Sequence, residues 1–469
     1  MLKIYYENKE YSIQIEYCFE ILGNCIGQEV SFVNDINDLK KYESNCLNIV
    51  YSGNYDVEYG INGIIIREGN LFSDVFYLKK ESIVENTFCY IDDVPVLFGN
   101  KKLNSYSKFE WGIECYADIV QSIFYLVTSY EEYVLKDAIY FDEHSRFKVL
   151  EKYIYKQSLM YRPLVNEYAS KLYEWAEFCG ILLKVEKKRE TTVHLTHDLD
   201  HPFAQGILTH ILQKMKVVKP KLNLGCEIIR EDEMKRNIVS SWYIMHQGEN
   251  AFDGKYECYN PLVKSFAFKE QARGCELGYH YSYEASEKDE LALKEAENIR
   301  ETFKLTYLCG RNHFLRYKAG VSENVYSQLN IFYDTTQGCA YHEGFYRGVC
   351  IPYQLFDLVK SEKLKTWEIP LIVMDGTLRD KKYRGLTPEE AYSCIEELLY
   401  IVDKYKGVFS ILWHNTSVCG RYWRKWYNKV YLKFLNKITE EKYAVLMGGK
   451  IINLYKNQKL DCNEVGNEE

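Results

Sequence analysis

Asp198 and Asp200 lie one residue apart at the end of an apolar run, within Leu195-Thr-His-Asp-Leu-Asp-His-Pro202. On an extended strand, residues two apart point to the same side, so these carboxylates are close neighbours. Such neighbours repel each other unless a cation or a proton lies between them. A metal ion bound by one carboxylate, with the other free to act as a base, resolves this repulsion. A solvated or helix-capping acidic loop is the alternative, and the flanking histidines His197 and His201 make the two interpretations about equally strong.

His280 and Glu284 form a second candidate group, within Glu276-Leu-Gly-Tyr-His-Tyr-Ser-Tyr-Glu284. An imidazole and a carboxylate four residues apart can converge on one ion if a turn or helix begins there. A lone histidine is more often a hydrogen-bonding residue than a ligand. A position next to a glycine at the end of a strand favours the ligand interpretation for His280.

His414 ends a third apolar run, Val408-Phe-Ser-Ile-Leu-Trp-His-Asn415. A buried strand that carries an imidazole at its carboxyl end suits a general acid, because the pKa of imidazole lies near neutrality. Two weaker pieces accompany it. Arg311-Asn-His-Phe-Leu-Arg-Tyr317 supplies a guanidinium near a strand end, although most arginines are surface residues or structural ion-pair partners. Asp375 follows an apolar run, where an aspartate is usually a cap or turn residue.

The chain from Thr191 onward alternates strands, loops and helices, and this pattern must position the residues above. Such alternation predicts a parallel sheet, open or closed into a barrel. Ligands in these folds bind beyond the C-terminal ends of the strands, which is where the polar residues lie. We predict strands at Val193–Leu199, Ser240–Met245, Glu276–His280, Tyr307–Cys309, Ile331–Asp334, Thr366–Ile369 and Val408–His414, with helices that include Glu287–Phe303 and Pro388–Tyr405.

The N-terminal part has a different pattern. Residues 1–100 alternate short β-rich runs with an amphipathic stretch at Ile13–Gly27, which predicts a small α/β domain. Between Glu114 and Gly180 the apolar residues recur with a helical period. We therefore predict three parts: an N-terminal α/β and helical module at residues 1–185, a larger α/β domain at 190–450 and a C-terminal tail at 451–469.

Composition narrows the class of protein. The 469 residues are 47% hydrophobic and 27% charged, as in a globular protein. The 59 basic and 67 acidic residues give a net charge of −8, which argues against a nucleic-acid partner. No apolar stretch resembles a signal peptide or approaches the roughly 20 residues of a membrane span. The 15 cysteines include no C-x-x-C pair and fit buried thiols in a reducing cytoplasm, so we expect a cytoplasmic protein.

The order of these pieces resembles the polysaccharide deacetylase family, the NodB-homology domains of carbohydrate esterase family four. The family's first motif, a strand ending in D-D or D-x-D, is similar to Leu195–Asp200. This likeness implies that Asp198 is the general base and Asp200 a metal ligand. The second motif, H-[ST]-x-x-H, resembles the run from His280, with Glu284 in place of the second histidine ligand. A carboxylate binds zinc at about the same distance as imidazole, so Asp200, His280 and Glu284 form a reasonable ligand set, with His201, His313 and His342 in reserve.

Of the three remaining family motifs, one is matched loosely, one is matched well and one is absent. The third, R-x-P-[FY], is matched loosely by Arg316 and Tyr317, and the likeness implies that Arg316 orients the base. The fifth, an apolar strand ending in L-x-H, is similar to Leu412-Trp-His414, so His414 would protonate the leaving amine. The fourth, D-x-x-D-W, is absent. Either Asp334 or Asp375 could tune His414 in its place, and we favour Asp375.

The resemblance covers roughly Thr191 to Met447 and implies a deformed (β/α) barrel, preceded by the smaller N-terminal domain. The upstream sequence is similar to a bacterial branch of deacetylase-like proteins that carries an N-terminal module. The implied function is a metal-dependent hydrolase, with zinc, cobalt or manganese, that removes N-acetyl groups from amino sugars in a polysaccharide or its precursor. Two alternatives stay open. One is a non-catalytic carbohydrate-binding or scaffold protein on a degenerate barrel, and the other is a hydrolase of a different non-peptide carbon–nitrogen bond.

Overall fold

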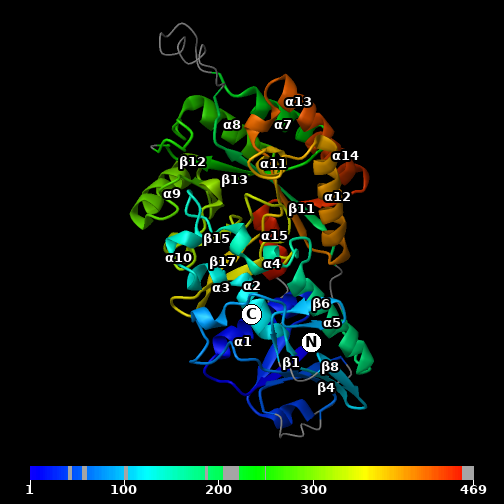
Figure 1. Cartoon of the computed structure of the whole chain (residues 1–469). Helices are drawn as coiled ribbons and strands as arrows, with labels where there is room; N and C mark the ends of the chain where they lie inside the picture. Colours follow the sequence, from blue (N-terminus) through cyan, green and yellow to red (C-terminus); the bar gives the residue numbers. More distant parts are fainter. Residues whose placement is uncertain are drawn as a thin grey trace, which may run out of the picture.

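The computed structural model describes residues 1–40, 45–54, 61–99, 104–184, 189–203, 221–248 and 250–456. Two large sheets organise this part of the chain (Figure 1). The N-terminal residues, in blue and cyan, form the smaller sheet, and the residues from Thr192 onward, in green to orange, form the larger one. Among the described helices, none combines the length and apolar character that a bilayer crossing needs.

The smaller sheet confirms the predicted N-terminal α/β domain. Its strand order is β2-β1-β3-β4-β9-β8, and every neighbouring pair is parallel except β8 with β9. Helix α1 packs against both α5 and α2. The elements are β1 (Leu2–Tyr6), α1 (Ser12–Ile26), β2 (Val30–Val33), β3 (Leu47–Ser52), β4 (Gly63–Arg67), β5 (Cys89–Ile91), β6 (Val94–Val96), β7 (Phe98–Gly99), β8 (Tyr106–Phe109), β9 (Gly112–Cys115), β10 (Ala117–Asp118), α2 (Ile119–Val127), α3 (Tyr130–Val134), α4 (Tyr153–Lys156) and α5 (Leu164–Phe178).

The larger sheet contains all seven predicted strands. Its order is β16-β17-β15-β14-β13-β12-β11-β19-β18, with β20 beside β11, and its pairs are parallel except β16 with β17. The prediction omitted β16, β18 and β20. The strands are β11 (Thr192–Leu199), β12 (Ser241–Met245), β13 (Glu276–Tyr281), β14 (Leu308–Asn312), β15 (Ile331–Asp334), β16 (Tyr353–Asp357), β17 (Glu362–Glu368), β18 (Val373–Met374), β19 (Val408–Leu412) and β20 (Ala444–Val445).

Helices follow most of these strands and cover the outer face of the sheet. Helix α8 packs on β13, and α12 packs on β19. This alternation is the strand–helix pattern expected from the sequence. The helices are α7 (Leu224–Met234), α8 (Pro261–Ala272), α9 (Asp289–Phe303), α10 (Ser322–Leu329), α11 (Asp375–Arg379), α12 (Pro388–Lys404), α13 (Arg421–Lys429), α14 (Tyr431–Glu440) and α15 (Gly448–Lys456).

The larger sheet is curled into a deformed barrel, because its two ends are joined by a short piece of chain. Laid flat, the sheet would separate β17 from β18 by seven strand spacings, roughly 34 Å. The connecting residues 369–372 can span at most roughly 18 Å. Ile369 donates its backbone N–H to Asp334 of β15, and Ile372 donates to Ser410 of β19. The link therefore draws the two sides of the sheet together.

Alternation along β11 separates the interior of the barrel from its outer face. Thr196 and Asp198 point inward and both accept hydrogen bonds from Arg311 of β14. His197, between them, points outward, where its ring lies 2.8 Å from a carboxylate oxygen of Glu233 in α7. The strand thus delivers Asp198 and then Asp200 to the open end of the barrel, as the spacing of two residues predicted.

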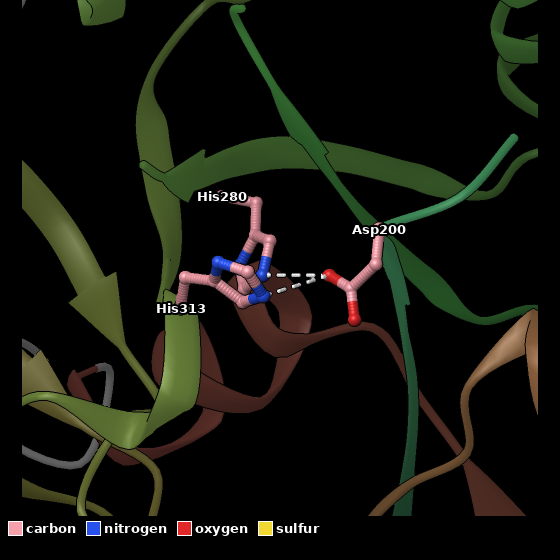
Figure 2. Close-up of side chains that lie close together, drawn as sticks. All are labelled: Asp200, His280 and His313. Carbon is pink, nitrogen blue, oxygen red and sulfur yellow. Dashed lines mark ion pairs between the residues drawn. The ribbon is translucent and has the colours of Figure 1, made fainter. Parts of the chain in front are cut away.

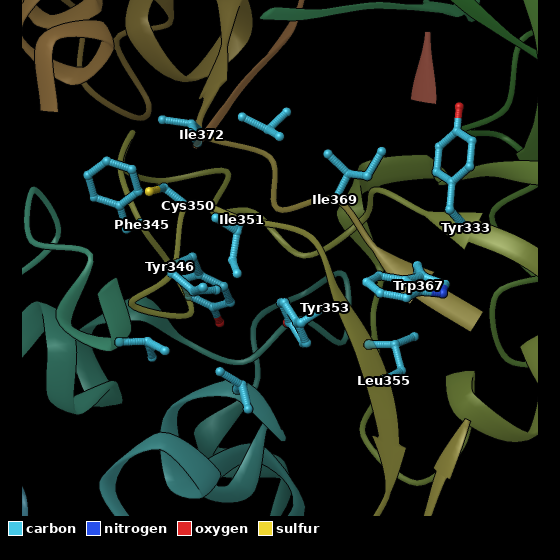
Figure 3. Packing of buried hydrophobic residues seen from close by; sticks show 14 of the residues in the cluster. Tyr333, Phe345, Tyr346, Cys350, Ile351, Tyr353, Leu355, Trp367, Ile369 and Ile372 are labelled. Carbon is cyan, nitrogen blue, oxygen red and sulfur yellow. The ribbon is translucent and has the colours of Figure 1, made fainter. Parts of the chain in front are cut away.

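The N-terminal module packs on the barrel over a buried surface. Figure 3 shows the segment from Phe345 to Tyr353 packed between the two, among buried apolar side chains. Arg347 from this segment makes two hydrogen bonds with Glu132 of α3, at 2.8 and 3.0 Å. Burial would raise the pKa of Glu132, but Arg347 and Lys152 lower it to about 2. The carboxylate is therefore charged and depends on cations from both parts.

The predicted boundaries of the three parts are only partly covered by the described residues. The expected boundary near residues 185–190 includes residues 185–188, which lie outside the described residues. Helix α15 continues to Lys456, and its Ile451 and Ile452 are fully buried, so packed structure extends past residue 450. The rest of the expected tail, residues 457–469, also lies outside the described residues.

A shortened chain that begins at Thr191 is expected to aggregate. It would expose the apolar surface that faces the N-terminal module and would leave Arg347, only 1% exposed in the full chain, without Glu132. An unpaired charge at a formerly buried site is strongly destabilising, by about 3–5 kcal/mol. Size-exclusion chromatography of both lengths checks this. A monodisperse shortened chain with full activity would refute the dependence on the module.

Candidate functional site

Asp200, His280 and His313 meet at the open end of the barrel (Figure 2). They follow or end β11, β13 and β14. Asp200 Oδ1 lies 3.1 Å from His280 Nε2 and 3.7 Å from His313 Nε2, and one possible ligand atom of each residue lies within 4.8 Å of the others. Ligands about 2.1 Å from a tetrahedral zinc ion stand roughly 3.4 Å apart. The three side chains therefore need only small movements to share one ion.

The hydrogen bonds of the two histidines fit a role as metal ligands. His280 Nδ1 donates to the Arg311 carbonyl at 2.8 Å, and His313 Nδ1 donates to the Asp253 carboxylate at 3.1 Å. In the neutral ring, each such bond leaves the lone pair on Nε2 free, which is the usual arrangement of a metal-bound histidine. Within the described residues, His280 Nε2 and Asp200 Oδ1 are buried without a hydrogen-bond partner. A cation between these atoms would satisfy both.

The electrostatics of this group also favour a cation. Burial alone would lower the pKa of His280, but Asp198 and Asp200 raise it above its usual 6.5. Burial would raise the pKa of Asp200, but the surrounding histidines hold it well below its usual value. The carboxylates thus attract positive charge to the point where the Nε2 atoms converge, whether a proton or a metal ion carries it.

Asp198 is held by a buried arginine. Arg311 Nη1 donates to Asp198 Oδ1 at 2.9 Å, and the other nitrogens of Arg311 donate to Thr196 and Thr335. The Arg311 side chain is completely buried. The second oxygen of Asp198 lies 3.9 Å from His280 Nε2, on the side of the candidate metal site. One oxygen is therefore fixed by Arg311, and the other is available to accept a proton.

His414 approaches the site from the end of β19, paired with Asp375. His414 Nδ1 donates to Asp375 Oδ1 at 2.6 Å, and His414 Nε2 lies 3.6 Å from Asp200 Oδ2. Burial would lower the pKa of His414, but Asp375, followed by Asp200 and Asp198, raises it to about 9. Asp375 is buried and also accepts a hydrogen bond from Ser417. The imidazole is therefore protonated at neutral pH and aimed at the site.

Replacing Asp375 with asparagine is expected to move the alkaline limit of turnover to lower pH. Asp375 is the strongest of the charges that raise the pKa of His414 to about 9, so its loss lets that pKa fall towards the ordinary value. A residue that acts as an acid works below its pKa, so turnover of the variant should decline at a lower pH than that of the wild type. The pH dependence of kcat for wild type, Asp375→Asn and the half-exposed control Asp380→Asn tests this. An unchanged alkaline limit in Asp375→Asn would contradict it.

Two predicted site residues lie elsewhere. The structure does not bring Glu284 to Asp200 and His280: its half-exposed carboxylate pairs with Lys288 and accepts a hydrogen bond from Asn250 at 3.2 Å. His313, one of the reserve ligands, occupies the third position instead. Arg316 does not contact Asp198, because its guanidinium donates to the carbonyls of His144 and Tyr283. Arg311 holds Asp198 in its place.

Two contributors were not assigned a role from the sequence. Arg311 could have been preferred to Arg316, because it alternates into the barrel just before β14 ends at Asn312. Asp253 comes from the loop after β12, where no motif marks it. Of the other reserve ligands, His342 lies beside Glu343, away from the group, and the carbonyl of His201 accepts hydrogen bonds from two asparagines.

A family model matches the N-terminal part of the chain. Residues 2–179 match a family of unknown function, DUF7033. No curated protein matches the chain.

Solved structures similar to the chain cover 55–61% of it. A Mycobacterium smegmatis protein described as a polysaccharide deacetylase is 14% identical, with a TM-score of 0.43, over 61% of this chain and 97% of its own. The allantoinase Puue is 12% identical (TM-score 0.40; 58% and 92% covered). A family 4 acetyl xylan esterase from Clostridium thermocellum, in complex with cobalt, is also 12% identical (0.30; 56% and 91%). With TM-scores below 0.5, none superposes closely, and the barrel assignment rests on the strand order of this chain.

Proposed function

We propose that the chain is a metal-dependent hydrolase that removes N-acetyl groups from amino sugars of a polysaccharide or its precursor. One observation carries the proposal: a candidate base and a candidate acid lie on either side of one possible ligand. Asp200 directs Oδ1 towards His280 and His313 and Oδ2 towards His414, while Asp198 lies next to His280. Hydrolysis of an amide needs both groups, because water must lose a proton and the departing nitrogen must gain one.

The division of labour follows from the hydrogen bonds. Arg311 keeps Asp198 oriented, so the free carboxylate oxygen accepts the proton of the attacking water. Asp375 keeps the His414 imidazole protonated. His414 Nε2 then donates its proton to the departing amine. The raised pKa suits this role, since the imidazole carries its proton before the reaction and can give it to the basic nitrogen that departs.

Asp200, His280 and His313 would hold the metal ion. One carboxylate and two imidazoles suit borderline divalent ions such as zinc and cobalt. When bound, such an ion polarises the acyl oxygen and acidifies water. Because His313 replaces Glu284 in this set, the site carries one carboxylate fewer than the sequence predicted and is correspondingly better matched to zinc and cobalt.

Metal analysis combined with an acetate-release screen tests the proposal. The purified chain is analysed for bound metals, stripped with chelator, reloaded with zinc, cobalt or manganese, and assayed on N-acetylated glucosamine oligomers. Acetylated xylan and a ureide serve as comparison substrates. We expect one ion per chain and metal-dependent acetate release from the N-acetylated oligomers. Turnover of the ureide alone would favour the other carbon–nitrogen hydrolase, and one bound ion with no turnover of any substrate, or no bound ion, would support the non-catalytic alternative.

A further inference from the structure

The loop that carries His313 has an unusual backbone. Phe314 and Leu315, directly after the histidine, both adopt positive φ angles, 60° and 55°. Residues other than glycine rarely adopt this left-handed conformation, and two in succession persist only where the surroundings hold them in place. The position of His313 therefore depends on contacts that keep this turn in shape.

Some of those contacts come from the N-terminal module. Arg146 Nη1 donates to the Phe314 carbonyl at 3.2 Å. The guanidinium is itself fixed by Asp142, which accepts a hydrogen bond from Nε at 2.8 Å and forms an ion pair with Nη2. Arg146 is only 7% exposed. Its hydrogen bond thus reaches from a rigid point in the module to the backbone of the residue that follows the candidate metal ligand.

The contact is reciprocal. Arg316, at the other end of the turn, donates from Nε to the carbonyl of His144 at 2.8 Å. The ring of His144 packs against that of Phe314, with centroids 4.4 Å apart, and its Nδ1 lies 3.1 Å from the Tyr283 hydroxyl. Phe314 in turn contacts the His313 ring at 4.6 Å. The module therefore contacts the turn on its backbone and on its aromatic side, where Phe252 and Tyr283 of the barrel also pack against Phe314.

We propose that the N-terminal module completes the metal site of the barrel, with Arg146 as a positioning residue for His313. This inference rests on the proposed metal site at Asp200, His280 and His313. Without the bond from Arg146, the turn at Phe314 relaxes and His313 Nε2 moves away from the other two ligands. The module thus contributes to metal binding by positioning a ligand of the barrel.

Cobalt titration of the full-length protein tests the inference, because the visible absorption of Co²⁺ reports its ligand set as well as its affinity. Arg146→Ala is expected to weaken Co²⁺ binding by about 10- to 100-fold, the usual effect of removing a residue that orients a metal ligand. Its absorption spectrum should shift towards that of His313→Ala. Arg146→Lys retains a charged donor next to Asp142 and should recover part of the affinity. Arg162→Ala is the matched control, because it removes a module arginine that pairs with Glu167 and Asp93.

Three outcomes would overturn the inference. Wild-type affinity and spectrum in folded Arg146→Ala would show that the module does not position His313. Equal weakening in Arg162→Ala would show that any damage to the module has the same effect. If Arg146→Ala does not fold, His144→Ala decides, since it removes the ring packed against Phe314 and keeps the backbone carbonyl that accepts from Arg316. Weaker Co²⁺ binding is expected, and unchanged binding would overturn the inference. Absence of Co²⁺ binding by the wild type would instead contradict the proposed function.

Discussion

His313→Ala is expected to weaken binding of zinc or cobalt by more than about 100-fold, whereas Glu284→Ala should leave it unchanged. His313 Nε2 lies 3.7 Å from Asp200 Oδ1, with its other nitrogen fixed by Asp253. The loss of an outer partner of a ligand already costs 10- to 100-fold in affinity, so the loss of a ligand should cost more. Equilibrium dialysis of both variants, with Asp200→Ala as a second ligand variant, measures the difference.

Glu284 is the matched control because it was the ligand expected from the sequence. Its carboxylate already pairs with Lys288, so its removal takes nothing from Asp200 or His280. A large loss of affinity in Glu284→Ala, together with full affinity in His313→Ala, would reverse the assignment. Equal affinity of wild type and Asp200→Ala for zinc or cobalt would show that Asp200, His280 and His313 do not form a metal site.

Asp198→Asn is expected to lower turnover by roughly 10²- to 10⁴-fold while the metal stays bound. Asparagine keeps the shape of the side chain and can still accept the hydrogen bond from Arg311, but it cannot take a proton from water. The loss should therefore appear in kcat and not in metal affinity. Initial rates of acetate release, with metal content measured on the same samples, test this.

Asp403→Asn serves as the control for Asp198→Asn. Asp403 lies in α12 and bonds Thr191 and Lys406, outside the candidate site. Its replacement should leave turnover close to that of the wild type. Acetate release by Asp198→Asn at the wild-type rate would exclude that residue as the base, even if the metal site were correct.

The strand ends that carry the site were predictable because each is a short β-rich run that closes on a polar residue. Asp198, Asp200, His280 and His414 were all placed at such ends, and the parallel sheet brings them to one rim. The period of two along β11 also predicts which residues point inward. These features depend on residues close together in the sequence.

The third ligand could not be found in this way, because it depends on which strands are neighbours. The predicted Glu284 needed a helix or turn to begin directly after His280, but β13 continues to Tyr281 and the next turn carries Glu284 towards Lys288. His313 comes from β14, which pairs with β13 so that His280 stands opposite Arg311. The order of strands in a sheet is a property of the whole fold, and a single strand does not encode it.

The pairing of β11 with β19 has a consequence for synthesis on the ribosome. Thr192 pairs with Val408, 216 residues later in the chain. At about 5–20 residues per second, this side of β11 waits on the order of 10–40 seconds for its partner to emerge. During that time the nascent chain presents the open edge of a strand that is buried along its whole length in the folded protein, and such an edge pairs readily with other chains. Production of soluble protein should therefore depend on chaperones that bind nascent chains, and slower translation at low temperature would lengthen the exposure even as it weakens hydrophobic association.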